Sequence, residues 1–266
     1  MKAVFGKWFS QRGMLLSGFG AIFTFWIFKQ VADLRSYFNN LASKRREKRF
    51  NAYYWNEISD YCSYFSHNAN SVLEVGCGNG DLLAKLSGRR KVGIDFSEEY
   101  IAWANERHKG KGIDFLQMDA NRITLNETFD FIVISNLIGY VDDIQQVFEQ
   151  VKKCCHHNTK VVVQFYNSFW EPFIKFFELT GIKQKTPVQN WLSTRDINNL
   201  LFVSGFDVYR NTKRLIFPFY FPILSFLLNK YLAKLPLFRF FSFNIYSFAK
   251  PLPLSNEADY TGKYST

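Results

Sequence analysis

The sequence predicts an α/β domain built on a doubly wound, mainly parallel sheet. An apolar strand at residues 72–75 runs into a turn with three alternate glycines, and Leu82 and Leu83 then open a helical pattern. This order of strand, glycine turn and helix is typical of the nucleotide-binding corner of such folds. Further short strands follow, separated by helical stretches, a pattern that predicts parallel pairing with right-handed crossovers.

The glycine turn follows Glu74 and lies between the first strand and its helix. Glycine tolerates positive φ and has no Cβ, so a ligand can approach the backbone closely. The dinucleotide pattern G-x-G-x-x-G needs its third glycine at position 81, where this chain has Asp81. The observed spacing is G-x-G-x-G instead, and a glycine turn alone is weak evidence for any ligand.

Polar residues end several predicted strands. Asp95 ends the strand at 91–95, about twenty residues after the turn, where an acid in α/β nucleotide sites accepts hydrogen bonds from ribose hydroxyls. Phe96 follows it and is placed to cover one face of an adenine. Asp119 ends a third strand and Asn136 a fourth, and a fifth strand is predicted at 160–165. Each acid alone is typical of a solvated turn, but together with Glu74 they predict one ligand site.

These residues resemble the class I S-adenosylmethionine (SAM)-dependent methyltransferases, whose first motif is E/D-x-G-x-G-x-G. The resemblance implies SAM as cofactor, with Asp119 near the adenine amino group, the Ala120 amide at the ring edge and Asn136 beside the transferred methyl. It implies a Rossmann-like, seven-stranded methyltransferase sheet across 50–250, with an antiparallel last strand. The cofactor-binding residues it implies are Glu74, Gly76, Cys77, Gly78, Gly80, Asp95, Phe96, Asp119, Ala120 and Asn136.

Local signals place the helices and the last strands. Ser97 is expected to cap a helix whose first turn carries two acids, which the helix dipole favours. A second helix is expected to start at 142–144, and a third, capped, to run from Ser193 to near Gly205. Strands are predicted at 206–210 and 244–249.

Two apolar runs lie outside the nucleotide-binding half. Residues 1–49 form a hydrophobic and basic N-terminal segment, in which 14–28 predict a hydrophobic helix that is shorter than a comfortable bilayer span of roughly twenty residues. Residues 215–243 predict a hydrophobic insertion near the C-terminus, and 251–266 form a tail. Basic residues flank both runs, as suits an anionic membrane surface, and those that follow the first would hold the domain at the cytosolic face. The alternative is extra core, with one helix packed on the sheet and a lid over the site.

Other functional classes find less support. A net charge of +10 allows a nucleic-acid partner, but Asn136 lacks the following Pro-Pro-aromatic of base-amine methyltransferases and no cysteine adjoins a proline. We therefore expect no nucleic acid. The run Cys154 to His157 lacks the two-residue ligand spacing of zinc sites and falls in the loop predicted before the fifth strand, so we expect no metal. Cysteine usage is typical of a reduced, cytosolic chain.

A narrower resemblance is to bacterial methyltransferase domains often fused to family 2 glycosyltransferases. It is carried by segments 53–56, 166–172 and 189–192, besides the SAM motifs. It implies a small or lipid-linked acceptor, in a saccharide context, with O-methylation favoured, and a glycosyltransferase partner on a separate polypeptide. Two alternatives stay open: a non-catalytic SAM-binding scaffold for such a partner, and aminopropyl transfer, which favours paired acids where this chain has Ser135 and Asn136.

The sequence names no catalytic base. Tyr140, Tyr166 and Asn167 follow the fourth and fifth strands and are expected to face the crevice. His108 is expected to be a solvated cap at the far end of its helix. The pair Tyr53 and Tyr54 predicts either a flap over SAM or aromatic packing against the first helix.

Overall fold

The computed structural model describes residues 34–42, 52–181, 189–216, 227–231, 235 and 238–253. The predicted apolar helix at 14–28 lies outside the described residues, and so do most of the insertion at 215–243 and the tail beyond residue 253. Within the described part of the chain, no helix is long and apolar enough to cross a membrane.

A seven-stranded sheet in the order β3-β2-β1-β4-β5-β7-β6 forms the centre of the domain. Strands β1 to β5 pair in parallel, and β7 is antiparallel to both β5 and β6. The predicted seven-stranded α/β methyltransferase sheet and its antiparallel last strand are therefore confirmed. The strands are β1 (Ser71–Val75), β2 (Arg90–Asp95), β3 (Ile113–Gln117), β4 (Phe129–Ser135), β5 (Cys155–Tyr166), β6 (Phe206–Arg214) and β7 (Asn244–Pro251).

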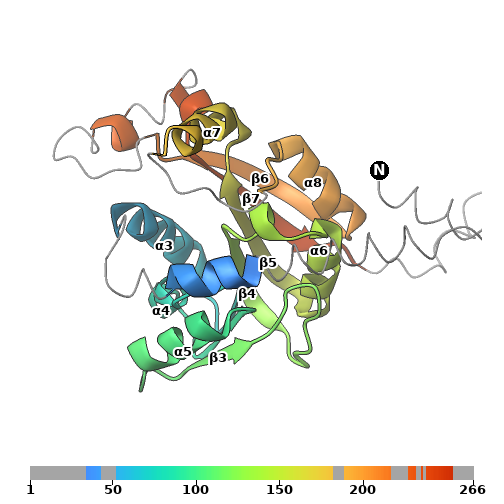
Figure 1. Cartoon of the computed structure of the whole chain (residues 1–266). Coiled ribbons are helices and arrows are strands. Elements are labelled where there is room, and N and C mark those ends of the chain that lie inside the picture. The colour runs from blue at the N-terminus through green and yellow to red at the C-terminus, as the bar shows by residue number, and fades with distance from the viewer. Residues whose placement is uncertain are drawn as a thin grey trace, which may run out of the picture.

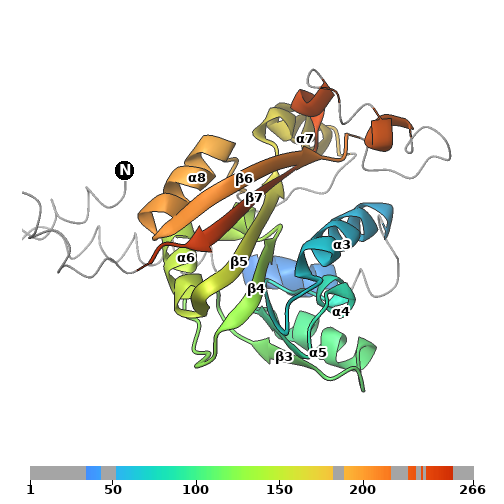
Figure 2. The ribbon, with the colours of Figure 1, turned by 180° about the vertical axis from the view of Figure 1, so that it is seen from behind.

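Helices cover both faces of this sheet (Figures 1 and 2). Apolar side chains of α3, α4 and α5 pack on one face, and those of α6 and α8 on the other. Because both faces are covered, the central strands are buried almost throughout, as parallel sheets require. The helices are α3 (Ala52–Ser66), α4 (Asp81–Lys85), α5 (Glu98–Arg107), α6 (Ile144–Lys153), α7 (Glu171–Leu179) and α8 (Thr194–Val203), with short turns η1 (Ile138–Tyr140), η2 (Ser168–Trp170), η3 (Leu227–Tyr231) and η5 (Phe238–Phe241).

The predicted starts of three helices are confirmed, and each is capped by a side-chain hydrogen bond. Ser97 caps α5 by accepting from the Tyr100 amide, and Asp143 caps α6 by accepting from the Gln146 amide. Ser193 forms a capping box with Asp196 at the start of α8. These side chains satisfy amides that have no partner inside the helix, so each helix begins where its cap stands.

The segment before α3 contributes an additional element to the domain. Residues 34–42 form a helix, drawn bright blue and unlabelled, which lies in front of the strands in Figure 1 and behind them in Figure 2. Its Phe38 ring meets Phe96, just after β2, and Tyr140, just after β4, with centroids 5.7 and 5.0 Å apart. This part of the N-terminal segment is thus packed against the carboxyl ends of the strands.

Candidate active site

The glycine turn occupies the carboxyl end of β1, where the strand order reverses between β2 and β4. Gly76, Gly78 and Gly80 all have positive φ, of 79°, 50° and 75°. The amides of Gly76 and Cys77 both donate to the Ile94 carbonyl, at 2.8 and 2.9 Å. The turn is therefore tied to β2, and its three glycines give it a positive-φ conformation that other residues rarely adopt.

Two buried carboxylates hold this turn in shape. Glu74, at the end of β1, accepts from the Leu83 amide at 2.9 Å and so anchors the start of α4. Asp95, at the end of β2, accepts from the Gly78 amide and from the Ser97 amide, each at 2.9 Å. Burial raises the pKa of both carboxyl groups above their usual values. Glu74 lies behind the turn, whereas Asp95 lies beside it, where the ribose contact is predicted.

The predicted adenine side of the site is formed after β2 and β3. Phe96 is half-buried, and Phe38 of helix 34–42 stands edge-on to its ring. Asn39 of the same helix accepts a hydrogen bond from the Ser97 hydroxyl at 2.6 Å. The sequence predicts residues 34–42 as part of the N-terminal segment and not of the domain. It does so because the aromatic and basic residues of this helix resemble those of the apolar segment that precedes it.

Asp119 and Ala120 follow β3, which ends at Gln117 and not at Asp119 as predicted. The Asp119 carboxylate is exposed and accepts from the backbone and side-chain amides of Asn121, at 2.8 and 3.0 Å. Its contact with an adenine amino group stays a prediction, as does that of the Ala120 amide.

A buried polar network lies at the ends of β4, β5 and β7. Gln164 of β5 accepts from the Asn136 backbone amide and donates to Asn244 of β7, both at 3.0 Å. The Tyr54 hydroxyl, from α3, lies 3.2 Å from Asn136 Oδ1 and 3.1 Å from Asn244 Oδ1. Tyr54 is almost fully buried, so it forms part of the site's interior and is not a surface flap. Asn136 itself has a left-handed φ of 52°, uncommon for a residue other than glycine.

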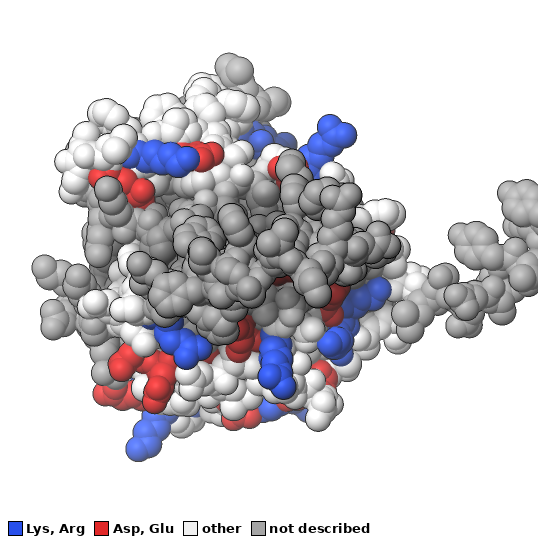
Figure 3. All heavy atoms as spheres, turned by 45° about the vertical axis from the view of Figure 1, so that its right-hand side comes forward, with Lys and Arg blue, Asp and Glu red and all other residues white. Residues whose placement is uncertain are grey.

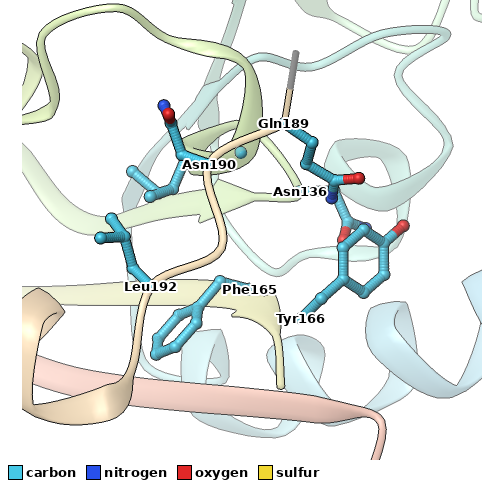
Figure 4. A pocket seen from close by; sticks show the side chains of 8 residues that line it. Asn136, Phe165, Tyr166, Gln189, Asn190 and Leu192 are labelled. Atoms are coloured by element: carbon cyan, nitrogen blue, oxygen red, sulfur yellow. The ribbon is translucent and has the colours of Figure 1, made fainter. Parts of the chain in front are cut away.

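A small pocket opens beside this network (Figure 4). Gln189, Asn136 and Tyr166 point toward one another across it, while Phe165 and Leu192 form an apolar side. Gly139 allows the Gln189 side chain to lie this close to η1, because a Cβ at position 139 would be only 3.0 Å from Gln189 Cγ. The lining residues are Asn136, Ile138, Gly139, Phe165, Tyr166, Gln189, Asn190 and Leu192.

Residues 189–192 reach the pocket through backbone pairing with η1. The Asn190 amide donates to the Gly139 carbonyl at 2.7 Å, and its side chain donates to the Val141 carbonyl at 2.8 Å. Tyr166 packs against Trp191 with ring centroids 6.3 Å apart. Two segments that carried the narrower sequence resemblance, 166–172 and 189–192, therefore meet at this pocket.

The sequence expectation for His108 was wrong in one respect. His108 does follow α5 as its cap, but it is 5% exposed, not solvated, and its Nε2 lies 3.1 Å from the Asn79 carbonyl of the glycine turn. Burial lowers its pKa, with Lys111 adding to the effect, so the neutral ring is favoured. Because it packs behind the turn against Phe115, its role is to support the turn.

The run Cys154 to His157 is also placed differently from its prediction. Strand β5 begins at Cys155, not at 160, because Cys155 already pairs with Phe129 of β4 across a bulge. His156 lies 3.0 Å from Asp130 of the neighbouring strand, and burial raises the pKa of the Cys154 thiol to about 11. Among the residues that the structure describes, no group of three His, Cys, Asp or Glu side chains could hold a metal ion.

Residues 72–158, about a third of the chain, match the family described as the methyltransferase domain. This match spans the glycine turn, the strand-end acids and Asn136. Over these residues the chain carries a methyltransferase domain. Its seven-stranded sheet and the position of the turn agree with that assignment.

Curated relatives of this methyltransferase domain act on different acceptors, according to their names. Malonyl-[acyl-carrier protein] O-methyltransferase of Bacillus anthracis is 26% identical over 159 residues, which are 55% of this chain and 58% of that protein. Phosphatidylethanolamine N-methyltransferase of Cereibacter sphaeroides is 37% identical over 98 residues, 35% of this chain and 48% of that protein. The chain thus spans about half the length of these relatives.

Solved structures share the fold of the methyltransferase domain over most of its length. Magnesium protoporphyrin IX methyltransferase of Synechocystis PCC 6803, with bound SAH, superposes with a TM-score of 0.60 at 14% identity, over 84% of this chain and 99% of that one. A putative methyltransferase of Haloferax volcanii, in complex with the activator Trm112, gives 0.63 at 13% identity, over 81% and 97%. At these identities the likeness shows the fold alone.

Proposed function

We propose that the chain transfers a methyl group from SAM to a small or lipid-linked acceptor. The observation that carries this is the glycine turn with buried Asp95 on one side and the Asn136 pocket on the other. A ligand with a ribose at Asp95 would extend along the turn toward Asn136. The pocket formed by Tyr166 and Gln189 would then hold the acceptor.

The residues fit such a cofactor by their own chemistry. Three glycines leave the turn without side chains, and Asp95 offers carboxylate oxygens. SAM supplies an activated methyl group, so the protein's task is to position donor and acceptor and to exclude water. The aromatic contact of Phe38 with Phe96 and Tyr140 covers the site on one side.

Methyl transfer is tested with the full chain, methyl-labelled SAM and extracts of lipids and of small metabolites. We expect calorimetry to show micromolar binding of SAM and of SAH, and label to appear in one class of extract. Binding of both without transfer to any extract would favour the alternative, a non-catalytic SAM-binding scaffold. No binding of either would exclude the methyltransferase function.

We further propose that the domain works at an anionic membrane surface, on its cytosolic side. Exposed aromatic side chains of α7 and η5 support this. Phe176 and Phe240 are 59% and 55% exposed, and Phe169 joins the two elements through rings 5.6 Å from Phe173 and 4.9 Å from Phe240. The upper part of the molecule in Figure 3, where α7 lies, is largely white with a few charged side chains.

The aromatic surface of α7 and η5 adjoins the acceptor pocket through Asn167. Its amide donates to the Phe243 carbonyl, and its side chain donates to the Phe240 carbonyl, both at 2.9 Å, one residue after Tyr166. Lys213 lies 5.9 Å from the Phe240 ring, where it would meet lipid phosphates. Such cationic and aromatic groups together suit the interface of an anionic bilayer.

Removing two aromatic rings from α7 should weaken membrane binding. We expect Phe176→Ser combined with Phe177→Ser to lower sedimentation of the full chain with phosphatidylglycerol vesicles several-fold, because each ring loses apolar burial of roughly 1–3 kcal/mol. The matched control is Phe202→Ser with Val203→Ser, two exposed apolar residues of α8. Equal losses in both variants, or none in either, would contradict the assignment of this surface.

The glycosyltransferase partner and the saccharide context stay predictions. The relatives described above are named for other acceptors, so these two points rest on the sequence resemblance alone. A lipid-linked acceptor is supported separately, by the proximity of the α7 and η5 surface to the pocket.

A further inference from the structure

We propose that Asn136, oriented by Tyr54, recognises a carbonyl or carboxylate oxygen of the acceptor. This inference rests on the proposed function, because it assigns chemistry to the acceptor side of the same site. It concerns a positioning residue, Tyr54, and a specificity-determining one, Asn136.

The donors and acceptors of the buried network can be assigned starting from the Asn136 backbone amide. A backbone amide can only donate, so the Asn136 amide fixes Gln164 Oε1 as the acceptor at 3.0 Å. The Ser135 hydroxyl donates to the same oxygen, also at 3.0 Å. Gln164 Nε2 must then face Asn244 and donate to its Oδ1. The orientation of two amides is thereby set.

The Tyr54 hydroxyl orients the side-chain amide of Asn136. This hydroxyl has one proton, and it lies within hydrogen-bond distance of two amide oxygens, Asn136 Oδ1 and Asn244 Oδ1. Asn244 Oδ1 already accepts from Gln164, whereas Tyr54 is the donor that reaches Asn136 Oδ1 among the described residues, so we assign the Tyr54 proton to Asn136 Oδ1. The other end of the Asn136 amide, Nδ2, is then directed away from Tyr54, and within the described residues it is buried without a hydrogen-bond partner.

An unpaired buried donor is costly and requires an explanation. Two such donors lie in this network within the described residues, Asn136 Nδ2 and Asn244 Nδ2, and of these two residues Asn136 is the one that lines the pocket. Asn136 also carries backbone strain, with its φ of 52° at the end of β4. Strain and an unpaired donor at one residue that lines a pocket are both explained if a ligand oxygen binds there.

The pocket narrows the class of ligand. Among the described residues that line it, none is charged, and Gln189 and Tyr166 add further polar groups opposite Asn136. Phe165 and Leu192 supply an apolar wall beside these polar groups. An oxygen acceptor satisfies the Asn136 donor, whereas an ammonium group has donors only and leaves it unpaired.

The test uses three probes of equal chain length: sodium butyrate, butyramide and butylammonium chloride. Each is titrated into the full chain labelled with ¹⁵N-asparagine, with and without saturating SAH. The Asn136 side-chain signal is identified by its loss in Asn136→Ser. We expect butyrate and butyramide to shift this signal and butylammonium to leave it in place.

Two tyrosines of helix α3 give a matched pair of variants. Tyr54→Phe removes the hydroxyl that orients Asn136, and we expect it to weaken butyrate binding roughly tenfold. Tyr61→Phe removes a hydroxyl that bonds Thr212 at 2.9 Å, away from the pocket, and should change nothing. SAH affinity should be the same in both variants, so a loss of butyrate binding is not a loss of the cofactor site.

The proposal is overturned if the Asn136 signal responds equally to butyrate and butylammonium, or to no probe. It is also overturned if Tyr54→Phe and Tyr61→Phe bind butyrate alike. Failure of the chain to bind SAH would instead exclude the proposed function, and the titration without SAH still decides whether the pocket takes an oxygen.

Discussion

Replacing Gly80 by alanine is expected to destabilise the domain by several kcal/mol. Gly80 has a φ of 75°, a conformation that costs an L-residue about 1–2 kcal/mol. A Cβ at this position would also overlap the Phe115 ring, and it would lie 3.1 Å from His108. Overpacking of this kind adds roughly 1–3 kcal/mol, because the ring is 6% exposed and has little room to move.

Gly110→Ala is the matched control for this substitution. Gly110 has a similar φ of 81°, but nothing lies within 4 Å of the position of its Cβ. We expect Gly110→Ala to lower the free energy of unfolding only by the cost of placing an L-residue at positive φ. The measurement is an equilibrium titration with urea. Equal losses for the two variants would mean that Phe115 and His108 do not constrain the turn.

Asp95→Ala should give the largest loss of cofactor affinity. The substitution removes the oxygens predicted to accept the ribose hydroxyls, and it leaves the Gly78 and Ser97 amides without their present acceptor. We expect a loss of roughly 1–3 kcal/mol, a tenfold or greater decrease in affinity for SAM and SAH by calorimetry. Asp207→Ala, at an exposed position on β6, is the control and should bind as the unaltered chain does.

The pH dependence of SAM and SAH binding provides a second test of Asp95. Burial raises the pKa of its carboxyl group, so on acidification it takes up a proton at a higher pH than an ordinary aspartate. A protonated carboxyl accepts fewer hydrogen bonds, so affinity should fall as the pH is lowered through this raised pKa. Asp95→Asn should lack this part of the dependence. If Asp95→Ala stays folded and binds SAM normally, the ribose role is wrong.

Features that depend on a few neighbouring residues were predictable. Ser97 and Ser193 each begin a helix because a side-chain oxygen satisfies a nearby amide, and this can be recognised within four residues of sequence. The strand β4 and the turn between Gly76 and Gly80 follow equally from local composition and backbone freedom. Their common carboxyl edge follows because parallel strands end on the same side.

His108 and the start of β5 show where local reasoning failed. His108 is polar and stands at the end of a helix, which is typical of an exposed cap, yet β3 and the turn cover it. The strand β5 extends back to Cys155 because β4 provides a partner at Phe129, and no residue between 155 and 159 signals that partner.

By itself, the sequence determined the α/β class, the order of its strands and helices, and the line of polar residues at the strand ends. It did so because periodicity, glycine freedom and helix caps act over short distances along the chain. Only the tertiary structure decided which polar groups meet. Tyr54, Asn136, Gln164 and Asn244 come from four separate elements, and 190 residues separate Tyr54 from the Asn244 that it contacts. Their hydrogen bonds, and the pocket that Gln189 closes, exist because the sheet places those elements side by side.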